Sequence, residues 1–348
     1  MNKFMFVDEK DIEFIWSTIQ KQQIVFHPKF APYGAFDYTQ FLLSKSKKPF
    51  ILCIDRNILI SLFKFCKNGF LKNEKEARSI GLIMAWSELN QVNLSSGFAI
   101  QERASQTQNQ VEGLLELQKF FEIINNYPSQ MWLQVAKGIT TKIPPLNFTF
   151  ELAQNITVDY SDGGDHYDMA LVSLLRMVQL YRNKSLQPME KFIEFFKWTC
   201  DNLLISEYML VYAILLFTDQ ENIKAPKNAN SNSFDRIFEG CKNQAWDITH
   251  LTHWSTIYSD SENYAEEILF ATNDDLLKRI FINKNGPNGW LGVLNETFSE
   301  KEYNHICTFV ENEISNRVKP YFGIDSRAYF QKLINKEKQE LLILLDNN

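Results

Sequence analysis

Carboxylates that directly follow short apolar runs are the residues with which this chain could do chemistry. Asp55 follows the run Phe50–Ile54, and Asp274 closes the polar segment after the run Glu267–Ala271. Both runs are short, apolar and bounded by polar residues, which is typical of buried strands in a parallel sheet. The carboxyl ends of such strands form the ligand crevice of the sheet. We therefore expect both carboxylates to face one crevice. The simpler alternative for either aspartate is a helix N-cap.

Two further acids complete a candidate set. Asp247 lies on a predicted helix, Phe234–Tyr258, that precedes the run Glu267–Ala271, and helical spacing places it on one face with His250. A second strand is predicted over Val92–Ile100, and Glu102 follows it closely. Glu88 is the alternative to Glu102. A solvated position near the helix start is the simpler explanation of Asp247 taken alone.

Several common catalytic motifs are missing from the sequence. It contains no G-x-x-x-x-G-K-[ST] phosphate loop and no G-x-G-x-x-G dinucleotide fingerprint. It also lacks a G-x-S-x-G nucleophile elbow. Alternation of the predicted strands with helices favours an α/β fold with a parallel sheet.

The ordered acids resemble the motifs of the PIN-domain nuclease family. That family has an apolar strand ending in Asp with a polar residue nearby, here Ile54-Asp55-Arg56-Asn57. It then has a helix beginning with Asp, here Asp247-Ile248-Thr249-His250, and a strand ending Thr-x-Asp, here Thr272-Asn273-Asp274. The resemblance implies a PIN-like Rossmannoid core with a central parallel sheet. It covers residues 48–105 and 234–283.

The resemblance also implies roles for individual residues. The family's catalytic, metal-holding acids correspond to Asp55, Glu102, Asp247 and Asp274. Substrate-positioning groups correspond to Asn57, Thr272 and His250.

A physical argument supports a metal at such a site. Several carboxylates that converge on one point cannot all stay ionised without a cation. Their hard oxygen atoms suit Mg²⁺ or Mn²⁺. Such ions orient a phosphate, activate water and stabilise the leaving oxygen.

The remaining segments are expected to be additions to the core. Residues 1–47 are predicted to form a helical N-terminal extension. Residues 106–233 are predicted to form a large helical insertion that small PIN toxins lack. Residues 284–348 read as a helical C-terminal extension. The insertion or the tail is the expected surface for a protein partner.

Composition narrows the class of protein. Of 348 residues, 45% are hydrophobic, which favours a folded globular protein. The net charge of −6 argues against a broad basic surface that binds long nucleic acid. The longest apolar run, Tyr208–Phe217, is about half the length of a membrane span, so no membrane segment is expected. Five scattered cysteines and an N-terminus without an apolar signal segment predict a cytoplasmic location.

These expectations combine into one functional hypothesis. It is metal-dependent hydrolysis of phosphodiester bonds, with RNA favoured because most of the resembled family cuts RNA. A toxin or antiviral defence effector is the role that the family suggests. The alternative is a catalytically inactive PIN-like scaffold that binds protein. A haloacid-dehalogenase-type phosphohydrolase is disfavoured, because it needs a second Asp where Asn57 stands.

Overall fold

The computed structural model describes residues 7–33, 35–45, 47–148, 163–220, 223–259, 265–320 and 325–346. The chain divides into two compact units. The first contains residues 1–163 and 256–274, and the second contains residues 164–255 and 275–348. The described residues form a mainly helical α/β protein with 15 helices and one small four-strand sheet.

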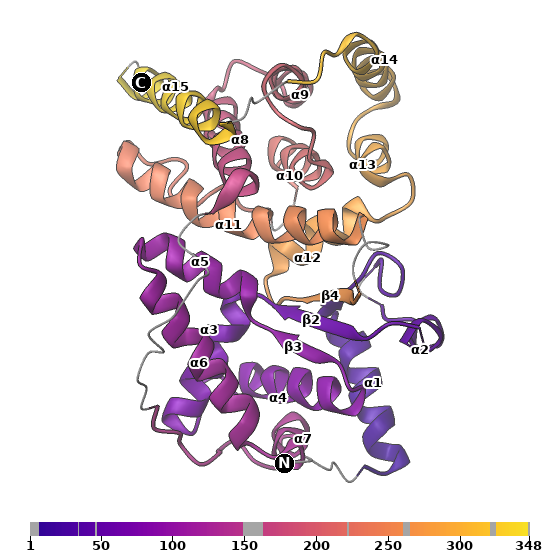
Figure 1. Cartoon of the computed structure of the whole chain (residues 1–348). Helices are drawn as coiled ribbons and strands as arrows, with labels where there is room; N and C mark the ends of the chain where they lie inside the picture. Colours follow the sequence, from indigo (N-terminus) through magenta and orange to yellow (C-terminus); the bar gives the residue numbers. More distant parts are fainter. Residues whose placement is uncertain are drawn as a thin grey trace. The chain divides into compact units, whose positions relative to one another are not determined.

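The sheet lies in the first unit and is mixed (Figure 1). Its strand order is β1-β4-β2-β3, in which β4, β2 and β3 are parallel and β1 pairs antiparallel with β4. The strands are β1 (Val25–Phe26), β2 (Phe50–Ile54), β3 (Asn93–Ser95) and β4 (Glu267–Ala271). The register pairs Ile54 with Ala271 and Cys53 with Ser95. The carboxyl ends of the three parallel strands therefore meet at one edge.

The predicted strands over Phe50–Ile54 and Glu267–Ala271 are confirmed with the same boundaries. The strand predicted over Val92–Ile100 is wrong in its second half, because β3 has only three residues and a helix begins at Gly97. The backbone carbonyl of Ser96 accepts the N–H of Ile100, which is the first helical hydrogen bond. The apolar residues of this stretch therefore fill the core from a helix.

Helices surround the sheet of the first unit. Among them, α7 packs closely on α4. A Cβ atom at Gly81 of α4 would lie 2.7 Å from the backbone nitrogen of Ala136 in α7, so glycine permits this approach. The helices are α1 (Glu9–Gln22), α2 (Tyr38–Lys45), α3 (Arg56–Asn68), α4 (Glu74–Leu89), α5 (Gly97–Thr107), α6 (Gln110–Asn126) and α7 (Ser129–Lys137).

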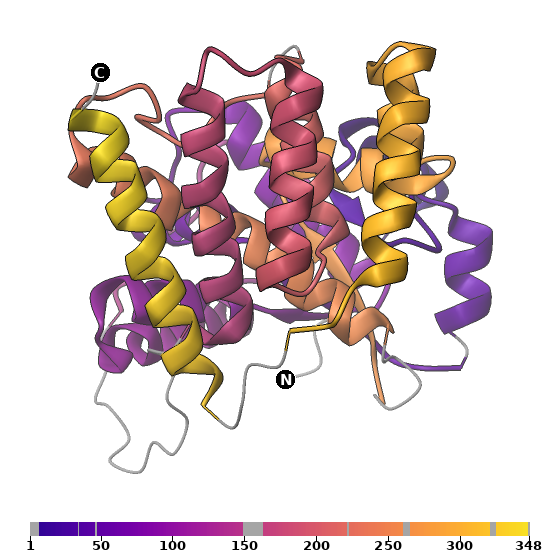
Figure 2. The same cartoon turned by 90° about the horizontal axis from the view of Figure 1, so that it is seen from above.

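All regular secondary structure among the described residues of the second unit is helical. Figure 2 shows α15, α8, α9 and α14 side by side, and the neighbouring pairs in this row are in contact. The apolar run Tyr208–Phe217 lies in α10, and all ten of its residues are buried. The helices are α8 (Gly164–Arg182), α9 (Pro188–Asn202), α10 (Glu207–Phe217), α11 (Phe234–Ser259), α12 (Asp275–Lys284), α13 (Gly289–Thr297), α14 (Glu300–Asn316) and α15 (Ser326–Asp346).

None of the helices in the described part of the chain is both long and apolar enough to cross a membrane. The predicted core and insertion are distributed over both units. Residues 48–105 and 256–274 belong to the first unit, whereas residues 234–255 and 275–283 belong to the second. The predicted insertion divides at residue 163 in the same way.

Candidate functional site

Asp55 lies at the carboxyl end of β2, between the ends of β3 and β4. Its side chain is 2% exposed. One carboxylate oxygen, Oδ1, accepts the backbone N–H of Ile58 at 2.7 Å, so Asp55 is the N-cap of α3. The other oxygen, Oδ2, accepts the hydroxyl of Thr272, and the backbone N–H of Asn273 also donates to the carboxylate. The capping alternative is thus correct, yet capping occupies only part of this carboxylate.

Thr272 orients the carboxylate from the end of β4. The backbone N–H of Asp274 donates to its Oγ1 at 2.9 Å, which leaves the hydroxyl proton for Asp55. The threonine side chain is 1% exposed. This arrangement explains the Thr-x-Asp spacing, because a two-residue turn brings the Asp274 backbone to Thr272.

Glu102 lies on α5, the helix that leaves the carboxyl end of β3. It is 8% exposed and accepts a hydrogen bond from Nε2 of Gln106 at 2.9 Å. Its alternative, Glu88, lies near the C-terminus of α4, which leads into the start of β3. The two ends of a strand lie at opposite edges of the sheet. The topology therefore favours Glu102 over Glu88 as a neighbour of Asp55.

Burial raises the pKa of both buried acids toward neutrality. The pKa of Asp55 rises to about 6, mainly through burial, with a further rise from the charge of Asp274. Hydrogen bonds from Thr272 and two backbone N–H groups oppose that rise. The pKa of Glu102 rises to about 7 through burial and the charge of Asp55, against the attraction of Arg56. Near pH 7, both carboxylates are therefore harder to ionise than exposed acids, and Glu102 titrates closer to neutral pH than Asp55 does.

Asp55 is the acid common to these interactions. Half-buried Asp274 raises its pKa, and Asp55 in turn raises the pKa of Glu102. Within the described ranges, no group of three His, Cys, Asp or Glu side chains is arranged to hold a metal ion. The first unit thus contains Asp55, Glu102, Thr272 and Asp274, with the acids coupled through Asp55.

The other predicted site residues have different surroundings. Asn57 is exposed in the first turn of α3. Asp247 and His250 lie on α11 within the second unit. There Asp247 accepts a hydrogen bond from Gln244 at 2.9 Å, and the buried ring of His250 lies 5.9 Å from that of Trp246.

The sequence analysis did not predict two features of the site. Arg56 donates to both carboxylate oxygens of Glu116 and lies beside Glu102, so it joins α3 and α6 near the acids. Ser96, between β3 and α5, is 2% exposed, and its hydroxyl has no hydrogen-bond partner among the described residues. Two patterns in the sequence could have pointed to these residues. Arg56 directly follows Asp55, and Ser96 belongs to a Ser-Gly pair that follows a strand.

Replacing Thr272 with Val should destabilise the protein by about 1.5–3 kcal/mol at pH 8, because a buried carboxylate loses a hydrogen bond to its charged form. The pKa of Asp55 should rise further for the same reason. The loss should therefore shrink below pH 6, where Asp55 is protonated. Urea unfolding at pH 8 and pH 5 measures both effects. Thr308→Val, at an exposed helical threonine, is the control. An equal loss at both pH values would contradict the role of Thr272.

No family model, curated protein or solved structure matches the chain.

Proposed function

We propose that this protein is a metal-dependent nuclease with a PIN-like core that hydrolyses phosphodiester bonds in RNA. The supporting observation is the buried Asp55 carboxylate at the end of the central parallel strand, coupled to Glu102 on one side and Asp274 on the other. A purely structural N-cap needs neither neighbouring acid. The raised pKa values of Asp55 and Glu102 indicate that these two carboxylates are costly to ionise unless a cation accompanies them.

The donor groups fit Mg²⁺ or Mn²⁺. Carboxylate oxygens are hard ligands, and Mg²⁺ usually keeps several waters while one or two carboxylates and substrate phosphates hold it. A site of this kind needs no preformed group of three protein ligands. Asp55 and Glu102 would hold the ion, with Asp274 beside them. Asp247 enters the proposal through the family resemblance alone.

The chain's own residues would orient and neutralise the site. Thr272 and the Asn273 N–H hold the Asp55 carboxylate in one orientation. Arg56 offsets part of the negative charge on Glu102. Exposed Asn57 is accessible for contact with a substrate phosphate. When bound, the ion would supply polarisation of the phosphate and activation of water.

The second candidate is a PIN-like scaffold without catalysis. It is favoured by one observation, which is that no three acidic or other metal-binding side chains are grouped in the described part of the chain. In that case Asp55 is a buried N-cap with a perturbed pKa and nothing more. The two candidates differ in one measurable property, cleavage of nucleic acid.

We expect the purified protein to cleave labelled single-stranded RNA in Mn²⁺ or Mg²⁺. EDTA should abolish cleavage, and excess Mn²⁺ should restore it, because the ion supplies several kcal/mol of transition-state stabilisation. A hairpin RNA and a single-stranded DNA of the same sequence define the substrate class. Undiminished cleavage in EDTA would remove the metal mechanism. No cleavage of any substrate in either metal would favour the scaffold.

A further inference from the structure

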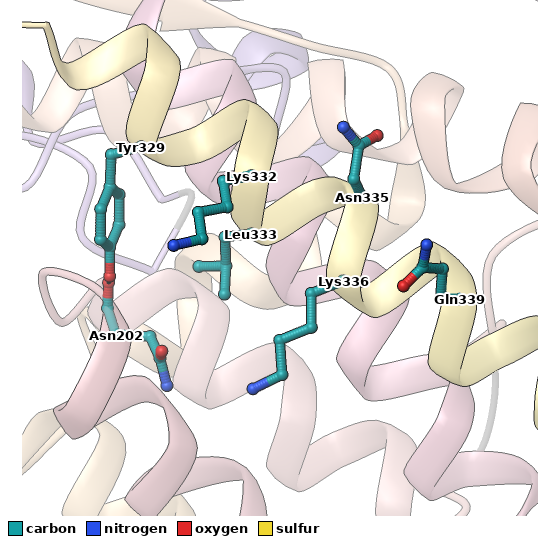
Figure 3. A pocket seen from close by; sticks show the side chains of 7 residues that line it. All are labelled: Asn202, Tyr329, Lys332, Leu333, Asn335, Lys336 and Gln339. Carbon is teal, nitrogen blue, oxygen red and sulfur yellow. The ribbon is translucent and has the colours of Figure 1, made fainter.

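The second unit contains a pocket beside α15 that the proposed active site does not use. Its volume is about 750 Å³, within the range of roughly 300–1,000 Å³ typical of ligand sites. Six of its described lining residues come from α15, and one ends α9 (Figure 3). They are Asn202, Tyr329, Lys332, Leu333, Asn335, Lys336 and Gln339.

The lining has the chemistry of an anion site. Lys332 and Lys336 are exposed, one helical turn apart, and neither makes an ion pair or hydrogen bond with the described residues. None of the seven residues is acidic. Like charges at i and i+4 repel each other on a helix surface. A bound anion would relieve that repulsion, and the amide groups of Asn335 and Gln339 add neutral donors and acceptors.

Buried contacts hold the pocket wall in place. On the buried side of α15, the carboxylate of Glu337 accepts hydrogen bonds from Trp198 at 3.1 Å and Gln179 at 3.0 Å. Glu337 is 1% exposed. The hydroxyl of Tyr329 donates to the backbone carbonyl of Asn202 at 2.9 Å, which fixes the aromatic ring. The wall is therefore positioned before a ligand arrives, which lowers the entropic cost of binding.

We propose that this pocket binds a nucleotide unit of a single RNA strand, an inference that rests on the proposed nuclease function. The two lysines would contact phosphate oxygens, and Tyr329 offers an aromatic surface to a base. The net charge of −6 over the whole chain favours a localised basic contact with RNA over binding along a broad surface. The shared chemistry is a phosphate joined to an aromatic base, which a free nucleotide also carries.

The test is fluorescence anisotropy with a labelled ten-nucleotide RNA in EDTA, so that no cleavage occurs. Lys332→Gln with Lys336→Gln should raise Kd about tenfold or more at low salt. It should also reduce the slope of log Kd against log salt by about 1.4, for two lost phosphate contacts on a single strand. The matched control is Lys227→Gln with Lys301→Gln, two exposed lysines elsewhere in the second unit. It should leave Kd within about twofold.

Competition and a ring variant separate the sources of binding. AMP should displace the RNA at much lower concentration than inorganic phosphate does. Tyr329→Leu should raise Kd several-fold, and by more than Tyr329→Phe, which keeps the ring but loses the hydrogen bond to Asn202. Circular dichroism confirms that each variant is folded.

Equal weakening by both lysine pairs, or no weakening by Lys332→Gln with Lys336→Gln, would overturn the proposal. Competition by phosphate as strong as by AMP would overturn the nucleotide assignment. RNA binding through the pocket without cleavage in any metal would contradict the proposed nuclease function and support this site. RNA cleavage by wild type, together with RNA binding that is unchanged in the Lys332→Gln with Lys336→Gln variant, would support the nuclease function and overturn the pocket as an RNA site.

Discussion

Asp55→Asn is expected to lower the rate of metal-dependent RNA cleavage by about a hundredfold or more. Such a loss corresponds to about 2.7 kcal/mol of transition-state stabilisation. The amide can still cap α3, because its oxygen can accept the Ile58 N–H. It removes the negative charge, however, and its NH₂ group cannot accept the hydroxyl of Thr272 or the N–H of Asn273. Single-turnover cleavage at saturating Mn²⁺ measures the effect.

Asp165→Asn is the matched control for this experiment. Asp165 is exposed in the first turn of α8 and accepts a hydrogen bond from Ser326 at 2.9 Å. The same chemical change there should leave the cleavage rate within a few-fold of wild type. If Asp165→Asn lost as much activity as Asp55→Asn, the active site would lie elsewhere in the chain. Full activity in Asp55→Asn would exclude Asp55 as a metal ligand.

The parts of the fold that the sequence predicted best were those with sharp boundaries. Phe50–Ile54 and Glu267–Ala271 are apolar runs closed by polar residues, and both are strands with those boundaries. Parallel pairing then places Asp55 and Thr272 at one sheet edge. The second strand was overextended, because an apolar stretch that enters a helix looks like a longer buried strand. β1 was missed, since two residues carry no periodicity.

The site's internal contacts could not be predicted because they join distant segments. The hydrogen bond from Thr272 to Asp55 spans 217 positions, and that from Arg56 to Glu116 spans 60. No local pattern fixes such pairs. The choice between Glu102 and Glu88 depended on which end of β3 each helix adjoins, and this required the helix boundary at Gly97. The raised pKa values likewise depend on burial, which spacing alone does not determine.

Glu102→Gln should stabilise the metal-free protein at alkaline pH. The folded-state pKa of Glu102 is about 7, against an ordinary value of 4.5. Ionised Glu102 therefore penalises the fold above pH 7, and the penalty fades toward pH 4.5 because the folded protein takes up the proton first. The glutamine keeps the oxygen that accepts from Gln106 and removes the charge. We expect up to about 3 kcal/mol of stabilisation at pH 8, and less than about 1 kcal/mol at pH 5.

Comparison of wild type with Glu102→Gln at each pH separates the contribution of Glu102 to stability from the contributions of other titrating groups. Buried His27, for example, has a lowered pKa and costs stability in acid for wild type and variant alike. Glu88→Gln is the matched control and should change the free energy of unfolding by no more than about 0.5 kcal/mol. Urea unfolding at pH 5 and pH 8, with EDTA or with Mn²⁺, supplies all the values.

Added Mn²⁺ should reverse the order of stability at pH 8. The ion binds the folded state and so stabilises wild type, whereas Glu102→Gln has lost one charged ligand and should gain less. At pH 5 the gain of wild type should shrink, because a proton competes with the ion for Glu102. If Glu102→Gln were less stable than wild type without metal at pH 8, ionised Glu102 would not penalise the fold. If Mn²⁺ also stabilised wild type, Glu102→Gln and Glu88→Gln equally, Glu102 would not bind the ion. The pairing of Asp55 with Glu102 at a metal site would then have no physical basis.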